Sequence, residues 1–415
     1  MPPDGAPPQR PTTAGWGRPD GDDGFLPYGR QTIEDDDIAA VVAALKSDLL
    51  TTGPKVAEFE AALAEAVGAQ HAVACANGTA ALHIAVRAAD LAPGEVCIVP
   101  AMTFLATADA CAFEGAEVVF ADVDPATGLM TPDSLSEALY RARYQRVRAI
   151  LPVHLRGDPV DLPAIRAMAD HAGAVVIEDA CHAIGGTTDW DTIGGCGASA
   201  MACFSFHAVK TLCLAEGGAV TTNDAETAQH LRRLRNHGAT RDPSRFRAPE
   251  AFAGDQANPW WYEQDELGWN YRLPDVNCAL GISQLHKLPR FAERRRRLAA
   301  LYREALAPLA PLIRTIDAPS YADPCLHLFG VLIDFEAAGV PRPEAMARLR
   351  ARGIGTQVHY IPVPWQPYWR AQGPQPPFPG AEAYYRRTLS LPLYPLMDDA
   401  DPARVAAALA EALKA

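Results

Sequence analysis

The feature that most constrains the fold of this sequence is the repeated alternation of short apolar runs with segments of helical length. Six such runs lie at residues 71–76, 96–100, 117–121, 149–153, 174–177 and 203–206. Parallel strands need long crossover connections, usually helices, so this alternation is typical of a sheet of mostly parallel strands. The sequence therefore predicts an α/β fold in which helices cover a mostly parallel central sheet.

Composition excludes several classes of protein. The chain has 415 residues, of which 49% are hydrophobic, enough for a large core shared between two domains. Its net charge of −13 disfavours nucleic acid and anionic lipid as partners. The apolar runs are too short and too often interrupted by charge to cross a membrane. The nine cysteines are odd in number and never spaced CxxC, which favours reduced thiols in the cytoplasm.

The sequence divides into three predicted segments. Residues 1–24 are rich in Pro, Gly and Asp and lack the apolar block of a signal peptide, so we expect a disordered extension. Residues 25–290 contain all six apolar runs and are expected to form the large domain. Residues 291–415 begin with a helical pattern and continue as mixed helix and strand, which predicts a bridging helix and a smaller α+β C-terminal domain.

Two segments within the large domain attract attention. Apolar residues from Ile38 to Leu49 follow helical spacing behind Thr32 and an acidic stretch at 34–37, which predicts a capped amphipathic helix. Between 237 and 268 the pattern dissolves into Arg, Pro, Trp and Gly. A connection of this length is unusual in a compact domain, and long loops often serve binding.

The first candidate for chemistry is the junction that follows the first apolar run. Gly78 and Thr79 lie between that run and a predicted helix at 80–89. The unpaired N–H groups at the start of a helix suit a phosphate. Alone, however, such a junction is more often a plain tight turn.

The second candidate is the pair Glu178 and Asp179 at the end of a β-branched run. A carboxylate at the end of a buried strand needs a partner, and ligands of open α/β sheets bind at the carboxyl ends of the strands. Asp179 is therefore placed where a cofactor could supply that partner. Equally, it could accept N–H bonds from the following turn as a helix cap.

The third candidate is Lys210, which follows an apolar run and precedes a glycine-rich turn at 216–218. A lysine usually lies in water. A partly desolvated amine has a lowered pKa and can bond covalently to an aldehyde. Together the anion cradle, the carboxylate and the amine match the requirements of pyridoxal 5′-phosphate (PLP).

The order of these elements, with Ser205 just before the lysine, resembles that of the DegT-type nucleotide-sugar aminotransferases. The resemblance covers nearly the whole chain after the extension, in the motifs PYGRQ (27–31), LTTGP (50–54), NGTAALH (77–83), EDACHA (178–183), EGG (216–218) and GWNYR (268–272). The stretches 204–211, 237–242 and 261–268 look most like the branch that aminates C4 of a UDP-linked 4-keto-6-deoxy-N-acetylhexosamine in pseudaminic acid biosynthesis.

The resemblance implies a PLP-dependent transferase of fold type I, similar to aspartate aminotransferase, with glutamate as amino donor and a nucleotide sugar as acceptor. Lys210 is implied to hold the cofactor's aldehyde and to carry a proton in turn. Asp179 is implied to keep the ring nitrogen protonated, and His182 to lie near the phenolic oxygen of the ring. Phe104 is expected to stack on the ring face.

The phosphate is implied to bind the backbone of Gly78 and Thr79 together with Ser205. Asn270 is expected to reach the same phosphate from a neighbouring subunit, so that a homodimer shares its active sites. The segments containing Thr51, Thr52, His359 and Tyr360 resemble those that line the sugar pocket, and Arg241 is placed to meet the nucleotide diphosphate. His359 can equally be a histidine satisfied at a strand end, and Arg241 can pair with a surface carboxylate.

Rival readings and departures remain at this level. Cys181, His182, Cys203 and His207 lie near the proposed site, but their spacing fits no zinc pattern, so we expect no metal. A regulatory relative without catalysis is disfavoured because Lys210 and Asp179 are present. The acceptor could instead be a dTDP-linked keto sugar or an inosose. Arg156 stands where the family resemblance leads us to expect a small or uncharged residue, a departure that could alter sugar choice.

Overall fold

The computed structural model describes residues 24–414, so the predicted extension lies, apart from Gly24, outside the described residues. The large sheet has seven strands in the order β1-β8-β7-β5-β4-β2-β3. Their bounds are β1 His71–Cys75, β2 Val96–Pro100, β3 Glu117–Ala121, β4 Val147–Ile150, β5 Val175–Asp179, β7 Met201–Ser205 and β8 Gly218–Thr222. Only β8 runs antiparallel to its neighbours, so the prediction of a mostly parallel sheet is confirmed.

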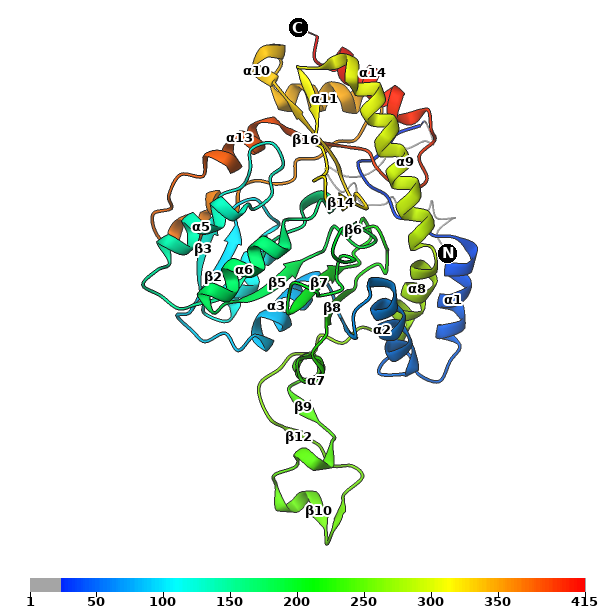
Figure 1. Cartoon of the computed structure of the whole chain (residues 1–415). Helices are drawn as coiled ribbons and strands as arrows, with labels where there is room; N and C mark the ends of the chain where they lie inside the picture. Colours follow the sequence, from blue (N-terminus) through cyan, green and yellow to red (C-terminus); the bar gives the residue numbers. More distant parts are fainter. Residues whose placement is uncertain (1–23, 415) are drawn as a thin grey trace, which may run out of the picture.

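Helices pack on both faces of this sheet, and the alternation of side chains along each strand divides the core in two. In β1, Val73 and Cys75 belong to the core that includes α3, whereas Ala72 and Ala74 belong to the core that includes α2. Figure 1 shows the helices around the sheet. They are α2 Pro54–Val67, α3 Gly78–Ala88, α4 Leu105–Phe113, α5 Pro132–Arg141, α6 Leu162–Ala172, α7 Ala225–Leu234 and α8 Asp275–His286.

The C-terminal part of the chain has a core of its own, built from Leu26 and residues between 298 and 413. The long helix α9 (Leu288–Leu306) runs from the large sheet into this part (Figure 1). A three-stranded antiparallel sheet, β13 Ile313–Thr315, β15 Phe329–Ile333 and β16 Thr388–Leu391, is covered by α11 Arg342–Ala351, α13 Pro379–Arg387 and α14 Asp401–Ala412. We retain residue 290/291 as the proposed boundary between the two domains.

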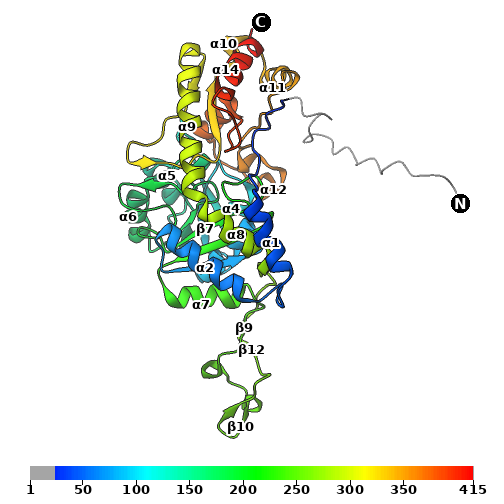
Figure 2. The same cartoon turned by 90° about the vertical axis from the view of Figure 1, so that its right-hand side faces the viewer.

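The segment predicted to be a long binding connection forms a narrow arm that extends away from the body of the molecule (Figures 1 and 2). Two short ribbons stiffen it, β9 Ala239–Thr240 with β12 Glu263–Gln264, and β10 Phe252–Ala253 with β11 Gln256–Ala257. Trp260 and Leu267 of the arm are 68% and 78% exposed. These large apolar side chains are therefore exposed to solvent, because the arm lies away from the rest of the molecule.

The first helix differs from its prediction. Helix α1 spans Asp35–Leu45, and its N-cap is Glu34, which closes a capping box with Asp37, so Thr32 is not the N-cap. The buried carboxylate of Asp37 accepts hydrogen bonds from Lys287 and Gln284 near the end of α8, and this polar anchor sets the face that α1 turns inward. As a result Ile38 and Leu45 remain 53% and 55% exposed. Among residues 24–414, no helix has the length and apolar content to cross a membrane.

Candidate active site

The loops at the carboxyl ends of β1, β2, β5 and β7 surround a cavity of about 690 Å³. These ends share one edge of the sheet because the four strands run in the same direction. Nine residues predicted to form the site line this cavity, namely Gly78, Thr79, Phe104, Asp179, His182, Ser205, Lys210, His359 and Tyr360. Segments far apart in the sequence therefore converge on one space.

One wall of the cavity is a ready anion cradle. Helix α3 starts there, and the Asn77 side chain caps it by accepting the Ala80 N–H at 2.8 Å. The N–H groups of Gly78 and Thr79, at the first turn, have no partner inside the helix. A Cβ on Gly78 would come within 2.7 Å of Ser205 Cβ, so only glycine lets the helix start approach the Ser205 hydroxyl. These groups fit a phosphate.

Gly218 at the start of β8 contributes to the same wall. A Cβ built on this residue would lie 2.2 Å from the carbonyl oxygen of Asn77. Strand β8 was not predicted, because the GG pair was interpreted only as a turn. The strand explains why the motif at 216–218 ends in glycine: the main chain of β8 must pass directly against the N-cap of α3.

Lys210 lies in the loop after β7, where its main-chain N–H donates to the His207 carbonyl at 2.8 Å. Burial lowers the pKa of its amine from 10.5, and the nearby Cys181 and Asp179 only partly oppose that effect. A larger fraction of neutral amine is therefore present at neutral pH than for a lysine in water. This is the condition for attack on an aldehyde.

Asp179 at the end of β5 is held by two donors. The Cys181 N–H donates to Oδ1 at 3.1 Å, and the Thr107 hydroxyl donates to Oδ2 at 2.7 Å. The Thr103 hydroxyl lies 2.7 Å from the Thr107 hydroxyl. Because Thr107 donates its hydrogen to Asp179, Thr103 is the donor in the bond between the two threonines. The turn cap that was the alternative interpretation of Asp179 thus exists, but it occupies one oxygen and leaves the carboxylate on the cavity wall.

Thr103 and Thr107 were not predicted as functional residues. Their signal was available, since they stand four residues apart at the start of a helix that follows an apolar run, where both hydroxyls share one face. His327 was missed as well. Its ring centroid lies 4.8 Å from that of His182, it lines the cavity, and its buried Nδ1 has no hydrogen-bond partner among the described residues.

Phe104, His359 and Tyr360 line the same cavity. Phe104 precedes α4, is 54% exposed as a residue, and its ring centroid lies 5.8 Å from that of Tyr360, which is compatible with stacking on a flat ligand. His359 donates to or accepts from Ser390 Oγ at 2.8 Å, and burial together with Lys210 lowers its pKa to about 3. The histidine is thus satisfied by a strand, as the alternative interpretation held, while it also lines the cavity.

The remaining predicted residues do not line this cavity. Of the described pockets, one next to the base of the arm includes Thr52 and another includes Arg241, and both include Asn236. Asn270 pairs with Asn236 in a short antiparallel bridge. Thr51 is exposed beside Thr52. The residues predicted for one site therefore fall into two groups, one around Lys210 and one around Asn236.

Arg156 does not line the cavity either, although the sequence suggested a role in sugar choice. Its buried guanidinium donates to Asp158 at 2.6 Å and to the Tyr384 hydroxyl of α13 at 3.0 Å. Only its main chain reaches the site, where its N–H donates to Nδ1 of His182 at 3.2 Å. Arg156 also adopts a positive φ of +63°.

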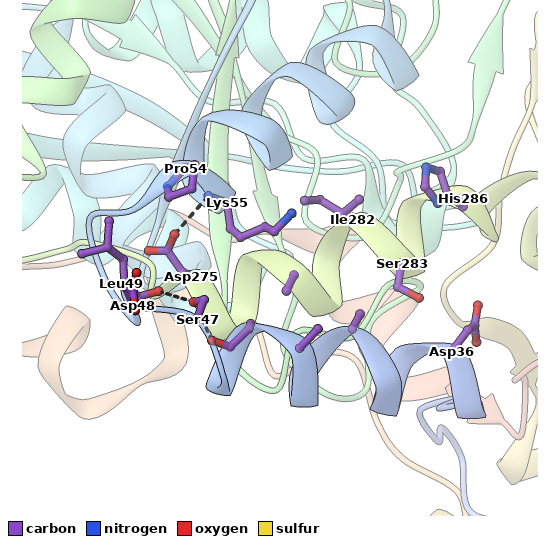
Figure 3. Close-up of a pocket in the computed structure, with 14 residues that line it drawn as sticks. Asp36, Ser47, Asp48, Leu49, Pro54, Lys55, Asp275, Ile282, Ser283 and His286 are labelled. Carbon is purple, nitrogen blue, oxygen red and sulfur yellow. Dashed lines mark hydrogen bonds between the residues drawn. The ribbon is translucent and has the colours of Figure 1, made fainter.

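A second pocket, of about 630 Å³, lies between α1, α8 and the start of α2 (Figure 3). Asp275 accepts the main-chain N–H of Lys55 at 3.0 Å there, and Ile282 and several alanines supply an apolar floor. It contains none of the residues predicted for the site. Among the described residues, no cluster of three or more His, Cys, Asp or Glu side chains is arranged to hold a metal ion.

The donor set of the first cavity fits PLP: free N–H groups and a hydroxyl for phosphate, a carboxylate for the ring nitrogen, and an amine of lowered pKa for the aldehyde. A family model described as the DegT/DnrJ/EryC1/StrS aminotransferase family matches residues 31–410. The chain belongs to this family. It is accordingly a PLP-dependent aminotransferase, and the predicted fold type is confirmed.

Solved structures of other proteins agree along almost the whole chain. The chain is similar to Helicobacter pylori PseC, an aminotransferase involved in the biosynthesis of pseudoaminic acid, with 26% identity and a TM-score of 0.84 over 94% of this chain and 99% of that one. It is also similar to DesV of S. venezuelae, with 32% identity and a TM-score of 0.80 over 93% and 99%. A third similar structure is Spr1654, a putative sugar aminotransferase of Streptococcus pneumoniae solved in its PMP form. The sequence identity is 25% and the TM-score 0.84, over 94% of this chain and 99% of that one.

Proposed function

We propose that this aminotransferase moves an amino group from glutamate to the C4 keto group of a UDP-linked 4-keto-6-deoxy-N-acetylhexosamine. The observation that carries the chemistry is the placement of Lys210 and Asp179 in one cavity with the α3 anion cradle. The likeness to PseC supports the choice of sugar, together with the motifs at 204–211, 237–242 and 261–268.

In this proposal the tasks are divided between Asp179 and Lys210. PLP, when bound, supplies an electron-withdrawing ring that stabilises negative charge on the donor's α-carbon. Asp179, fixed by Thr107 and the Cys181 N–H, holds the proton on the ring nitrogen. Lys210 Nζ would hold the aldehyde of the cofactor and, once free, would take the proton from the donor's α-carbon and return it to the cofactor. The same residues act in reverse order on the keto sugar, which predicts ping-pong kinetics.

We infer a homodimer in which the arm-base group, Thr51, Thr52, Arg241 and Asn270, completes the Lys210 cavity of the partner. Lys210 is the only Lys or Arg among the described residues that line the cavity, yet a phosphate, a dicarboxylate donor and a nucleotide diphosphate must be accommodated. The arm base offers Arg241 and Arg272 in two neighbouring pockets. The exposed apolar side chains of α1 and of the arm support an assembly that covers them.

Subunit complementation tests this arrangement. Lys210→Ala and Asn270→Ala chains are unfolded together, refolded as a mixture and assayed at limiting PLP. If the sites are shared, half of the dimers carry one intact site, and the mixture recovers about a quarter of the wild-type rate. A mixture no more active than the average of the separate variants would contradict the shared site while leaving the chemistry untouched.

The substrate is tested by loading the protein with pyridoxamine phosphate and adding UDP- and dTDP-linked 4-keto-6-deoxy sugars and an inosose in separate reactions. Return of the visible absorption of the lysine-linked cofactor with the UDP-linked N-acetyl sugar is the expected result. Return only with a dTDP sugar or the inosose would keep Lys210 and Asp179 in their roles and replace the substrate.

A further inference from the structure

The hydroxyl of Tyr360 has a defined direction, set by its neighbour His182. The centroid of the Tyr360 ring lies 5.8 Å from that of Phe104 and 6.0 Å from that of His182. Its oxygen lies 3.0 Å from His182 Nε2. Which atom donates in this contact depends on the protonation of the histidine.

The main chain decides that protonation. The Arg156 N–H donates to Nδ1 of His182 at 3.2 Å, so Nδ1 presents a lone pair and carries no hydrogen. Burial, followed by the charges of Lys210 and Arg156 among its neighbours, lowers the pKa of His182 well below 6.5 and keeps the ring neutral. A neutral imidazole has a single N–H, which must therefore be on Nε2. His182 donates to Tyr360, not the reverse.

The hydrogen of the Tyr360 hydroxyl is therefore directed elsewhere. Among the described residues, no other hydrogen bond is found for this hydroxyl, and the residue lines the cavity that contains Lys210 and Asp179. Burial and the nearby Asp179 raise the pKa of the Tyr360 phenol well above 10, so it keeps its hydrogen at neutral pH. The side chain is a permanent donor on the cavity wall.

The polar atoms of PLP identify the acceptor by elimination. The proposed site provides the cradle of Gly78, Thr79 and Ser205 for the phosphate, Asp179 for the ring nitrogen and Lys210 for the aldehyde. The phenolic oxygen of the ring is left. The sequence suggested His182 for it, but the one N–H of His182 is already given to Tyr360. We propose that Tyr360 donates its hydroxyl hydrogen to the phenolic oxygen of PLP, and that His182 is a positioning residue that acts through Tyr360.

This proposal rests on the proposed site and extends it to the main chain of Arg156. The φ of +63° at Arg156 is uncommon for a residue with a side chain. It is held by the buried contacts of the guanidinium with Asp158 and Tyr384. The main-chain N–H of Arg156 thus fixes the histidine tautomer, and the tautomer fixes which atom donates in the contact with the tyrosine hydroxyl.

Binding of PLP and of its 3-deoxy analogue, which lacks the phenolic oxygen, provides the test. Tyr360→Phe is expected to weaken PLP binding about 10-fold and to leave binding of the analogue within about 2-fold of wild type. The matched control is Tyr302→Phe, a buried phenol of the C-terminal core whose hydroxyl has no partner among the described residues. Equal losses for both cofactors in Tyr360→Phe would overturn the proposal.

A second measurement separates Tyr360 from His182. If His182 acts through Tyr360, His182→Gln weakens PLP binding in the wild-type background and adds less than about 2-fold in the Tyr360→Phe background. An undiminished effect of His182→Gln in that background would mean that His182 contacts the oxygen itself, and the proposal would be wrong. Lys210→Ala in the same titration must lose the visible absorption. If it does not, the proposed site fails, and that failure is distinct from a wrong donor.

The tautomer itself can be observed without cofactor. In protein labelled with ¹⁵N at histidine, the ring nitrogens of His182, assigned from the spectrum of His182→Gln, should show a hydrogen on Nε2 and a bare Nδ1 at pH 7. A hydrogen on Nδ1 would overturn the proposal at its first step.

Discussion

The Lys210 cavity and the base of the arm both contain residues that the sequence assigns to one active site, and they differ in how completely the chain itself satisfies them. In the cavity, the buried Asp179 carboxylate and both ring nitrogens of His182 have hydrogen-bond partners within the chain. At the arm base, Thr51, Arg241 and Asn270 are exposed. The chain therefore fixes these two cavity residues by its own contacts, whereas the predicted residues at the arm base remain exposed.

The largest effect is expected inside the cavity. Lys210→Ala should reduce turnover by at least about 10³-fold, because no other amine lines the cavity among the described residues. Thermal unfolding should change little, since the lysine forms no ion pair with any residue between 24 and 414. Lys414→Ala, at the exposed C-terminal end, is the matched control in the same assay. A Lys210→Ala protein that still turns over would show that the catalytic amine does not lie in this cavity.

Asp179→Asn keeps the shape of the second cavity residue and removes its charge. Turnover should fall about 10²- to 10⁴-fold, because a neutral amide cannot hold a proton on the ring nitrogen. Steady-state rates with glutamate and the keto sugar measure the effect. Near-normal rates would show that another carboxylate has this task.

The cavity should also be sensitive to acid. The pKa of His359 is lowered to about 3 by burial and by Lys210, so this residue stabilises the folded state fully above pH 6.5. That stability is lost as the pH falls from 6.5 towards 3, at about 1.4 kcal/mol per pH unit. Urea unfolding of wild type and His359→Gln at pH 7 and pH 5 should differ in slope with pH by roughly this amount. Parallel slopes would contradict it.

Thr107→Val sharpens the comparison by removing one hydrogen bond to Asp179 without changing side-chain shape. Hydrogen bonds to charged groups are worth about 1.5 to 3 kcal/mol, so the free energy of unfolding should fall by roughly that amount and turnover by about 10-fold. Thr107→Ser keeps the hydroxyl and should recover most of both. If valine and serine behave alike, the hydroxyl has no part in holding the carboxylate.

The smallest effect on stability is expected at the arm base. Arg241→Ala should change the free energy of unfolding by less than about 0.5 kcal/mol and leave PLP binding intact, because the side chain is exposed. The KM for the nucleotide sugar should instead rise about 10-fold through loss of a charged hydrogen bond. Urea unfolding and steady-state kinetics on the same preparation measure both. An unchanged KM would remove Arg241 from the proposed sugar site.

Sequence patterns identified the buried strands and the residues at their carboxyl ends. An apolar run that ends in a polar residue marks the carboxyl end of a buried strand, and Asp179 and Ser205 end β5 and β7 in this way. Strand β8 was missed because its first residue, Gly218, reads as part of a turn. Its glycine is explained only by contact with Asn77, 140 or so residues away along the chain, which no local pattern contains.

Sequence patterns did not predict hydrogen bonds between side chains that lie far apart along the chain. The bond from Thr107 to Asp179 joins residues 72 apart in the sequence. The apolar stripe of α1 correctly indicated a helix but not its exposure, because the inward face is set by the bond between Asp37 and Lys287. Arg156 was singled out as unusual, yet its partner Tyr384 lies in another part of the fold.

The buried contact between Arg156 and Tyr384 limits how this enzyme can be recombined with its relatives. Grafting a foreign C-terminal region onto residues 25–290 would replace Tyr384 while leaving the arginine inside the protein. In a chimera that lacks a hydroxyl at that position, one N–H of the buried guanidinium would have no hydrogen-bond acceptor. The free energy of unfolding would then fall by about 1 to 3 kcal/mol. Exchanges of substrate-binding segments should therefore treat positions 156 and 384 as a unit and carry both residues across together.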